Sequence, residues 1–234
     1  MQIFYVNDLD GDSCTMDETE SRHCARVLRM SKGDRVNLID GKGVFCEGVI
    51  TDPDPRGCTI RITDRKEEFE KRNYRLHIAI SPLKNPDRFE WFIEKSVEIG
   101  VDELTPLICR NTEKPGIKKE RINNIIVSAM KQSIKAYRPV LNDPQDFSEF
   151  IHKDYSGLKI IAHCSQSQQR SAITDIYSKG NDAVIMIGPE GDFSDDEIAV
   201  AIEKGFRPVH LGRSRLRTET AGVAACSAVY FANI

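Results

Sequence analysis

The stretch from residue 183 to residue 222 contains two runs of the same construction, and this repeat constrains the fold more than any other feature. Each run has an apolar strand, a loop that contains glycine, and a helix. In the first run, residues 183–187 are short and continuously apolar, which is typical of a buried parallel strand. The loop GPEGD follows at once. Ser194 stands three residues before Glu197, and this capping-box spacing predicts the start of a helix.

The second run predicts a strand over residues 208–211, a loop over 212–217, and a C-terminal helix with Thr218 or Thr220 as N-cap. We predict that the two loops lie at the carboxyl ends of adjacent strands, where an open α/β sheet places a ligand. Ordinary turns between strands and helices are an equally valid interpretation of the two loops. The glycines that would let a ligand approach the backbone are Gly188, Gly191 and Gly212.

Taken together, the motifs IGPEGDFSDDE and LGRSRLRTETA resemble the signature pair of the RsmE family, which belongs to the SPOUT class of methyltransferases. The segments VLRM, EKSVEIGVDELTP and AMKQSIKAYRP, together with Lys84, are similar to the family in the same order. The resemblance therefore spans nearly the whole chain. The chain departs from the usual family residues, which are Gly, Arg, Ile, Thr and Glu, at Asp192, Ser214, Arg215, Val97 and Lys131.

The resemblance implies an α/β chain with a small PUA-like β-barrel domain that binds RNA, followed by a SPOUT domain. The SPOUT domain would have a mostly parallel sheet and a deep trefoil knot through which the last helix threads. It also implies S-adenosyl-L-methionine as cofactor and methylation of N3 of a uridine in 16S rRNA, conventionally numbered 1498. The implied partners are 16S rRNA within the 30S subunit and a second copy of the chain, as a homodimer.

The resemblance also implies roles for particular residues. Arg217 would stabilise a deprotonated uridine, and Glu190 or Glu219 would orient the base or accept its proton; which of the two does so is left open. Favourable electrostatics at a helix N-terminus would explain Glu219 equally well. The implied cofactor-binding residues are His163, Ile187, Gly188, Pro189, Glu190, Gly191, Leu211, Gly212, Leu216, Arg217, Thr218 and Ala221.

Two domains are predicted, over residues 1–72 and 73–234, with the charged stretch 64–73 at their boundary. The first domain is rich in predicted strands and has one helix, over residues 18–28. The second alternates strands with helices, which favours a mostly parallel sheet. Its predicted strands are 76–80, 103–109 and 158–162, and its predicted helices are 86–99, 119–137 and 146–152.

The net charge of −3 argues weakly against a nucleic-acid partner, but basic residues gather in segments 21–35 and 109–138. Arg22, Arg26 and Arg29 are predicted to share one face of the helix over 18–28. Ordinary solvated faces would explain both segments as well. The predicted RNA-binding residues are Arg22, His23, Arg26, Arg29, Lys32, Lys131, Lys135 and Arg138.

Several classes of protein are disfavoured. No apolar run reaches the length of a membrane helix and the N-terminus lacks the features of a signal peptide, so we expect a cytoplasmic protein. The seven cysteines contain no CxxC pair, so we expect free thiols and no metal. No GxGxxG motif follows a predicted strand, which argues against a nucleotide-dependent oxidoreductase. A non-catalytic RNA-binding ribosome assembly factor remains as the alternative.

Overall fold

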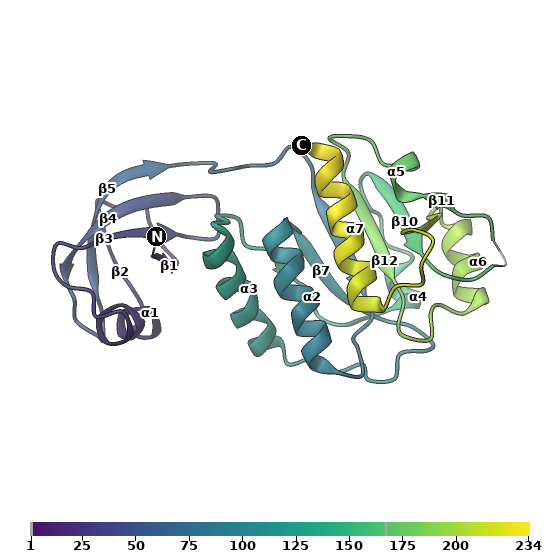
Figure 1. Cartoon of the computed structure of the whole chain (residues 1–234), viewed down its shortest axis with the longest axis horizontal. Coiled ribbons are helices and arrows are strands. Elements are labelled where there is room, and N and C mark those ends of the chain that lie inside the picture. Colours follow the sequence, from purple (N-terminus) through teal and green to yellow (C-terminus); the bar gives the residue numbers. More distant parts are fainter. Residues whose placement is uncertain (1, 167) are drawn as a thin grey trace. The chain divides into compact units, whose positions relative to one another are not determined.

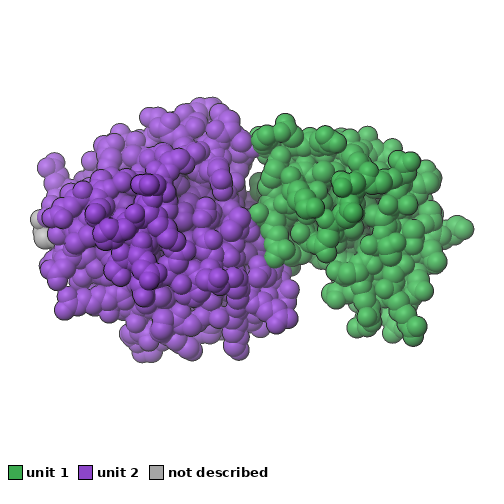
Figure 2. Space-filling view, turned by 180° about the vertical axis from the view of Figure 1, so that it is seen from behind, with its two compact units in different colours: residues 1–71, 127–138 green, residues 72–126, 139–234 purple. Residues whose placement is uncertain are grey.

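The computed structural model describes residues 2–166 and 168–234, and the chain divides into two compact units (Figures 1 and 2). Unit 1 comprises Met1–Lys71 and Val127–Arg138, and unit 2 comprises Arg72–Ile126 and Pro139–Ile234. Each unit is therefore built from two separate pieces of the chain. Among the described residues, no helix is long and apolar enough to cross a membrane.

Unit 1 contains a five-stranded sheet in the order β1-β3-β4-β5-β2. β1 pairs with β3 in parallel, and the other pairs are antiparallel. Two register shifts interrupt the β4–β5 ladder, and such irregularities bend a strand pair and increase its twist. Buried side chains such as Phe4, Leu38 and Ile60 form the core of this unit. The strands are β1 (Ile3–Tyr5), β2 (Ser13–Thr15), β3 (Arg35–Ile39), β4 (Phe45–Asp52) and β5 (Thr59–Lys66).

The predicted helix of unit 1 is present, but it changes its geometry part-way. Asp17 caps α1 (Glu18–Arg22) by accepting a 2.8 Å hydrogen bond from the backbone N–H of Glu20. The chain then continues as a π-helix over His23–Val27. Arg29 has a φ of 55° and lies beyond the helix. The prediction that three arginines share one helical face is therefore wrong for Arg29.

The segment Val127–Arg138 is tied to the N-terminal strands by backbone hydrogen bonds. The N–H of Gly43 donates to Ala136 and the N–H of Arg138 donates to Gly41, at 3.0 and 2.8 Å. The helix that leads into this segment, α3 (Lys119–Ser133), ends before Ile134, which has a φ of 58°. The prediction that this helix continues to residue 137 is therefore wrong, because the chain leaves the helix to make these bonds.

Unit 2 is built on an eight-stranded sheet in the order β11-β13-β10-β12-β6-β7-β8, with β9 also paired to β7. Every described strand pair in it is parallel, so the predicted mostly parallel sheet is confirmed. β10 lies between β12 and β13, so the prediction that these two strands are adjacent is wrong. The strands are β6 (Leu76–Ile80), β7 (Glu103–Ile108), β8 (Val140–Leu141), β9 (Gln145–Asp146), β10 (Leu158–Ala162), β11 (Ser171–Ala172), β12 (Ala183–Ile187) and β13 (Arg207–His210).

Helices cover both faces of this sheet (Figure 1). On one face α2 and α7 pack together, and they approach closely at Gly222, where a Cβ atom would lie 2.5 Å from the ring of Phe92. The other face is covered by α4 and α6, whose apolar residues join one buried cluster with β10 and β12. The remaining helices are α2 (Pro86–Ile99), α4 (Phe147–Phe150), α5 (Ile173–Ile176), α6 (Asp195–Glu203) and α7 (Thr218–Asn233).

Local capping signals fix where two of these helices begin. Asn85 caps α2 with Pro86 in its first turn, and the Ser194–Glu197 capping box begins α6, so both predictions are confirmed. The start of α7 differs from the prediction. Its N-cap is Arg217, whose side chain makes no capping hydrogen bond, and Thr218 is already helical.

Candidate active site

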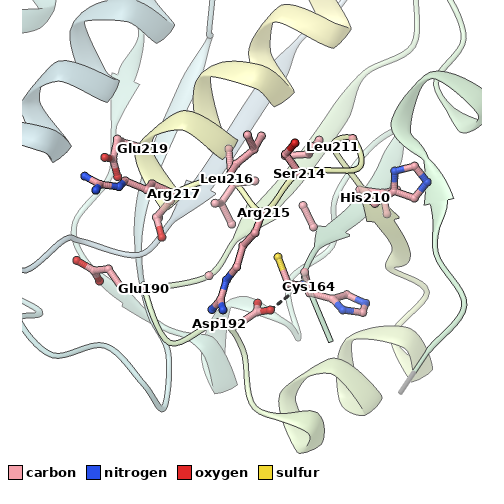
Figure 3. A pocket seen from close by; sticks show the side chains of 18 of the residues that line it. Cys164, Glu190, Asp192, His210, Leu211, Ser214, Arg215, Leu216, Arg217 and Glu219 are labelled. Carbon is pink, nitrogen blue, oxygen red and sulfur yellow. Dashed lines mark hydrogen bonds between the residues drawn. The ribbon is translucent and has the colours of Figure 1, made fainter. Parts of the chain in front are cut away.

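Three loops at one edge of the unit 2 sheet line a cavity of about 730 Å³ (Figure 3). They follow β10, β12 and β13, which are neighbours in the sheet and parallel, so their carboxyl ends meet at the same edge. The first turn of α7 and Arg88 on α2 complete the lining. The volume lies within the range of small-molecule sites, and the position matches the usual ligand site of open α/β sheets.

The structure brings nearly all the predicted cofactor-binding residues together in this lining. Gly191 is the exception, because a Cβ atom there would lie 3.3 Å from the Cβ of Asn111, outside the residues that line the cavity. Apolar walls come from Ile187, Leu211 and Leu216. The predicted residues that line the cavity are His163, Ile187, Gly188, Pro189, Glu190, Leu211, Gly212, Leu216, Arg217, Thr218 and Ala221.

The two glycines of the lining have different roles. Gly212 has a φ of 133°, in the region that favours glycine, and a Cβ atom there would meet no other atom within 4 Å. A Cβ atom on Gly188 would instead lie 3.0 Å from Phe193. Gly188 is therefore needed so that its own loop can fold back over Phe193, whereas Gly212 borders open space.

Glu190 fastens the loop after β12 to the loop after β6. Its Oε1 accepts a 3.1 Å hydrogen bond from the backbone N–H of Lys84, although the residue is otherwise exposed. The side chain of Lys84 points elsewhere and pairs with Glu113 at 2.9 Å. One carboxylate oxygen of Glu190 is thus already engaged in holding the two loops together.

Glu219 lies in the first turn of α7 and is nearly buried, with its side chain 10% exposed. Its Oε1 lies 3.8 Å from Nε of Arg88, so a guanidinium on α2 faces a carboxylate at the N-terminus of α7. Figure 3 shows Arg217 and Glu219 together at one end of the cavity, with Glu190 below them. Sequence reasoning missed Arg88, because nothing in its local sequence indicates a contact with a helix that begins 130 residues later.

Asp192 was noted in the sequence as a departure from the family pattern, and its role is visible only in the structure. Its Oδ2 accepts a 2.6 Å hydrogen bond from the backbone N–H of Cys164, and its Oδ1 accepts one of 2.9 Å from that of Phe193. It adopts a φ of 65°, which aspartate tolerates better than most residues. Asp192 therefore joins the loop after β10 to the loop after β12.

Two histidines also line the cavity. His163 is buried, and burial lowers the pKa of its ring below the ordinary value, so the neutral imidazole is favoured. Neither of its ring nitrogens has a hydrogen-bond partner among the described residues. The Nδ1 of His210, at the end of β13, is likewise buried and unpartnered. His210 was not predicted as a site residue.

All eight predicted RNA-binding residues belong to unit 1, because Val127–Arg138 is part of it. Two of them are engaged within the unit: Arg22 pairs with Glu18 one turn away, and Nζ of Lys131 lies 2.6 Å from Oε1 of the buried Glu20. All seven cysteines are free thiols. In the described part of the chain, no group of three or more suitable side chains could hold a metal ion.

Comparison with known proteins shows the family. Residues 70–230 match the family model of the RNA methyltransferase domain, and residues 17–63 match that of the RNA methyltransferase PUA domain. The ribosomal RNA small subunit methyltransferase E of Synechocystis sp. is 30% identical over 221 residues, which cover 92% of this chain and 72% of that protein. The chain belongs to the ribosomal RNA small subunit methyltransferase E family. The resemblance found in the sequence motifs is confirmed.

Solved structures of methyltransferase E and related proteins share the fold over the full chain. A probable rRNA methyltransferase from Porphyromonas gingivalis is 40% identical with a TM-score of 0.92, and the match covers 100% of this chain and 98% of that one. A methyltransferase E from Neisseria gonorrhoeae, solved bound to S-adenosyl methionine, is 28% identical with a TM-score of 0.87 and the same coverage. The α/β fold with a PUA domain is therefore shown.

Proposed function

We propose that this protein uses S-adenosyl-L-methionine to methylate N3 of a uridine in 16S rRNA, the one conventionally numbered 1498, during maturation of the small ribosomal subunit. The observation that carries the proposal is the cavity at the carboxyl ends of β10, β12 and β13, in a chain whose relative from Neisseria gonorrhoeae was solved with this cofactor. The cavity combines apolar walls with backbone groups and a few polar side chains, as small-molecule sites do.

The cofactor supplies an already activated methyl group, so the protein mainly has to hold the acceptor nitrogen in line with it. We assign the cofactor to the loops after β12 and β13, with Ile187, Leu211 and Leu216 as apolar walls. Gly212 leaves room beside the loop backbone, and Pro189, Thr218 and Ala221 complete the lining.

The acceptor end of the reaction falls to Arg217 and Glu219. N3 of a uridine is hidden by pairing inside a helix and carries a proton, so the base has to be splayed out and deprotonated. The exposed guanidinium of Arg217 stabilises the anionic base in this proposal, and Glu219, held by Arg88, orients the base or accepts its proton. We favour Glu219 over Glu190 because one oxygen of Glu190 already accepts the N–H of Lys84.

RNA recognition belongs to the N-terminal domain in this proposal, with residues 1–72 as the RNA-binding domain and 73–234 as the catalytic domain. Arg26, Arg29, Lys32, Lys135 and Arg138 bind RNA phosphates by charge. The protein acts in the cytoplasm as a homodimer on the 30S subunit, and its final helix threads a trefoil knot.

The test is methylation of a defined substrate. The protein is incubated with S-adenosyl-L-methionine and either 16S rRNA or 30S subunits that lack the modification, and the RNA is digested to nucleosides for mass spectrometry. We expect 3-methyluridine, and no methylation when the target uridine is changed to cytidine. Methyl groups on C5 or on ribose would contradict the N3 assignment. RNA binding without any affinity for the cofactor would favour the alternative, a non-catalytic assembly factor.

A further inference from the structure

His163 and His210 occupy matching positions on neighbouring strands. β10 and β13 pair in parallel with Ala162 opposite Val209, so His163 and His210 each follow a paired residue at the same edge of the sheet. The backbone N–H of His163 extends this ladder by donating to Val209 at 3.4 Å. Both histidines line the cavity, and Figure 3 shows His210 beside Leu211 at the end opposite Arg217 and Glu219.

The two rings hold most of the buried polar atoms that lack a partner. Of four such side-chain atoms in the described part of the chain, three are ring nitrogens of His163 and His210, and the fourth is on Glu20 in unit 1. Buried polar groups in folded proteins are nearly always hydrogen-bonded. Because three exceptions gather at one cavity, a ligand that supplies their partners explains them better than a packing defect.

The chemistry of the two rings indicates what that ligand group is. A neutral imidazole offers one N–H donor and one nitrogen acceptor, which suits an uncharged group that also has both. Burial keeps the ring of His163 neutral. The same cavity has apolar walls from Ile187, Leu211 and Leu216. Apolar walls with a donor and acceptor edge suit a flat purine base, whose edge also carries donors and acceptors.

We propose that His163 and His210 form the polar edge of an adenine-binding subsite and hydrogen-bond the base of the cofactor. This inference rests on the proposed function, since it assigns part of the same cavity. It places the nucleoside at the His210 end and leaves the end with Arg217 and Glu219 for the reacting groups.

The experiment compares two probes by calorimetry, S-adenosyl-L-methionine and 5′-methylthioadenosine, which share the adenosine but not the amino-acid part. His163→Phe and His210→Phe each remove the hydrogen-bonding nitrogens. We expect each variant to weaken both probes by about the same factor, roughly tenfold for one lost hydrogen bond in a buried site. The matched control is His152→Phe, at an exposed histidine whose Nδ1 contacts the carbonyl of Ser148. It should bind both probes as the wild type does.

Two further measurements separate a lost hydrogen bond from a steric or folding effect. His163→Gln restores a donor and an acceptor, so it should bind within about threefold of the wild type; if it binds as weakly as His163→Phe, the subsite is wrong. Without ligand, the melting temperature of the Phe variants should be unchanged or higher, because no protein contact is lost. A lower melting temperature with unchanged affinity would show a structural role and overturn the proposal.

The wild type decides which proposal a failure affects. If the wild type binds neither probe, the proposed function itself fails. If the wild type binds both and the Phe variants match it, or if they lose only S-adenosyl-L-methionine, the adenine subsite fails and the proposed function stands.

Discussion

Cys164 is exposed and lines the cavity, whereas the other six cysteines are buried. Methylation of a uridine at C5 requires a protein nucleophile, normally a cysteine thiolate, but N3 carries its own lone pair once deprotonated. The contact of Cys164 with Asp192 uses the backbone N–H and therefore survives a change of side chain.

We expect Cys164→Ser to keep methylation within about tenfold of the wild type, a barrier change of roughly 1.4 kcal/mol or less. Single-turnover rates and a denaturing gel for covalent RNA adducts measure this. An inactive but folded Cys164→Ser, together with an adduct in the wild type, would assign the thiol as a nucleophile.

Gly212 and Gly188 allow a matched pair of substitutions. Gly212→Val forces an unfavourable φ at a position that borders open space, so it should reshape the loop after β13 and lower cofactor affinity at least about tenfold. Gly188→Val overpacks the protein against Phe193 and should lower the free energy of unfolding by about 1–3 kcal/mol. Calorimetry and urea unfolding of both variants measure the two effects. Wild-type affinity in Gly212→Val would mean that its loop is an ordinary turn.

At the scale of elements, α3 and the residues that follow it carry two lysines with different surroundings. Lys131 pairs with the nearly buried Glu20, so Lys131→Ala leaves that carboxylate without its cation. We expect a loss of about 2 kcal/mol in the free energy of unfolding, less than for a fully buried pair because Lys131 is a quarter exposed. Lys135→Ala should change stability little and weaken RNA binding, with a smaller salt dependence. Urea unfolding and RNA binding over a salt series test both, and equal stability losses would contradict the distinction.

β6 carries a histidine that makes stability depend on pH. Burial lowers the pKa of His77 to about 4, and its Nε2 lies 2.7 Å from Oγ1 of Thr105. In the unfolded chain the ring titrates near 6.5, so between pH 6.5 and 4 only the unfolded chain takes up this proton. The contribution is therefore complete above pH 6.5 and is lost on acidification, by up to about 1.4 kcal/mol per pH unit.

His77→Gln should have a flatter dependence of unfolding free energy on pH in this window than the wild type. Urea unfolding at a series of pH values from 7 to 4 measures both slopes. Identical slopes would show that His77 titrates alike in the folded and unfolded chains.

The elements show which features a sequence can predict. The capping box of α6 and the Asn85–Pro86 start of α2 were predicted correctly, because their hydrogen bonds join residues two or three positions apart. The short strands β2, β9 and β11 were not predicted, since two or three residues carry no periodic pattern. The position of β10 between β12 and β13 was also missed, because strand order depends on pairing between distant segments.

The candidate site shows the same division. Its loops and most of its lining residues could be named from motifs, because these residues follow strands whose apolar pattern is local. The pairing of Arg88 with Glu219, the bridge from Asp192 to Cys164 and the contact of Gly188 with Phe193 depend on how the chain folds back on itself. A motif indicates which residues gather, but not which of them hold one another.

At the scale of the whole molecule, α7 ends with large apolar side chains that face solvent. Phe231 and Ile234 are 66% and 72% exposed, and exposed apolar groups of this size often mark an interface. We expect a homodimer by light scattering at micromolar concentration, and a shift toward monomer in Phe231→Asp. Val200→Asp, at a less exposed position on α6, is the control. A monomeric wild type with intact methylation would contradict the homodimer.

The return of Val127–Arg138 to unit 1 limits how genes for such proteins can be rearranged. A fragment that stops at residue 71 would lack the partners of Gly41 and Gly43 and the cation that faces Glu20. Moving the small unit intact to another protein would need two breakpoints, and the second falls inside the continuous helix α3. The two units are therefore expected to be inherited together, and RNA recognition cannot be exchanged between such enzymes by a single recombination event.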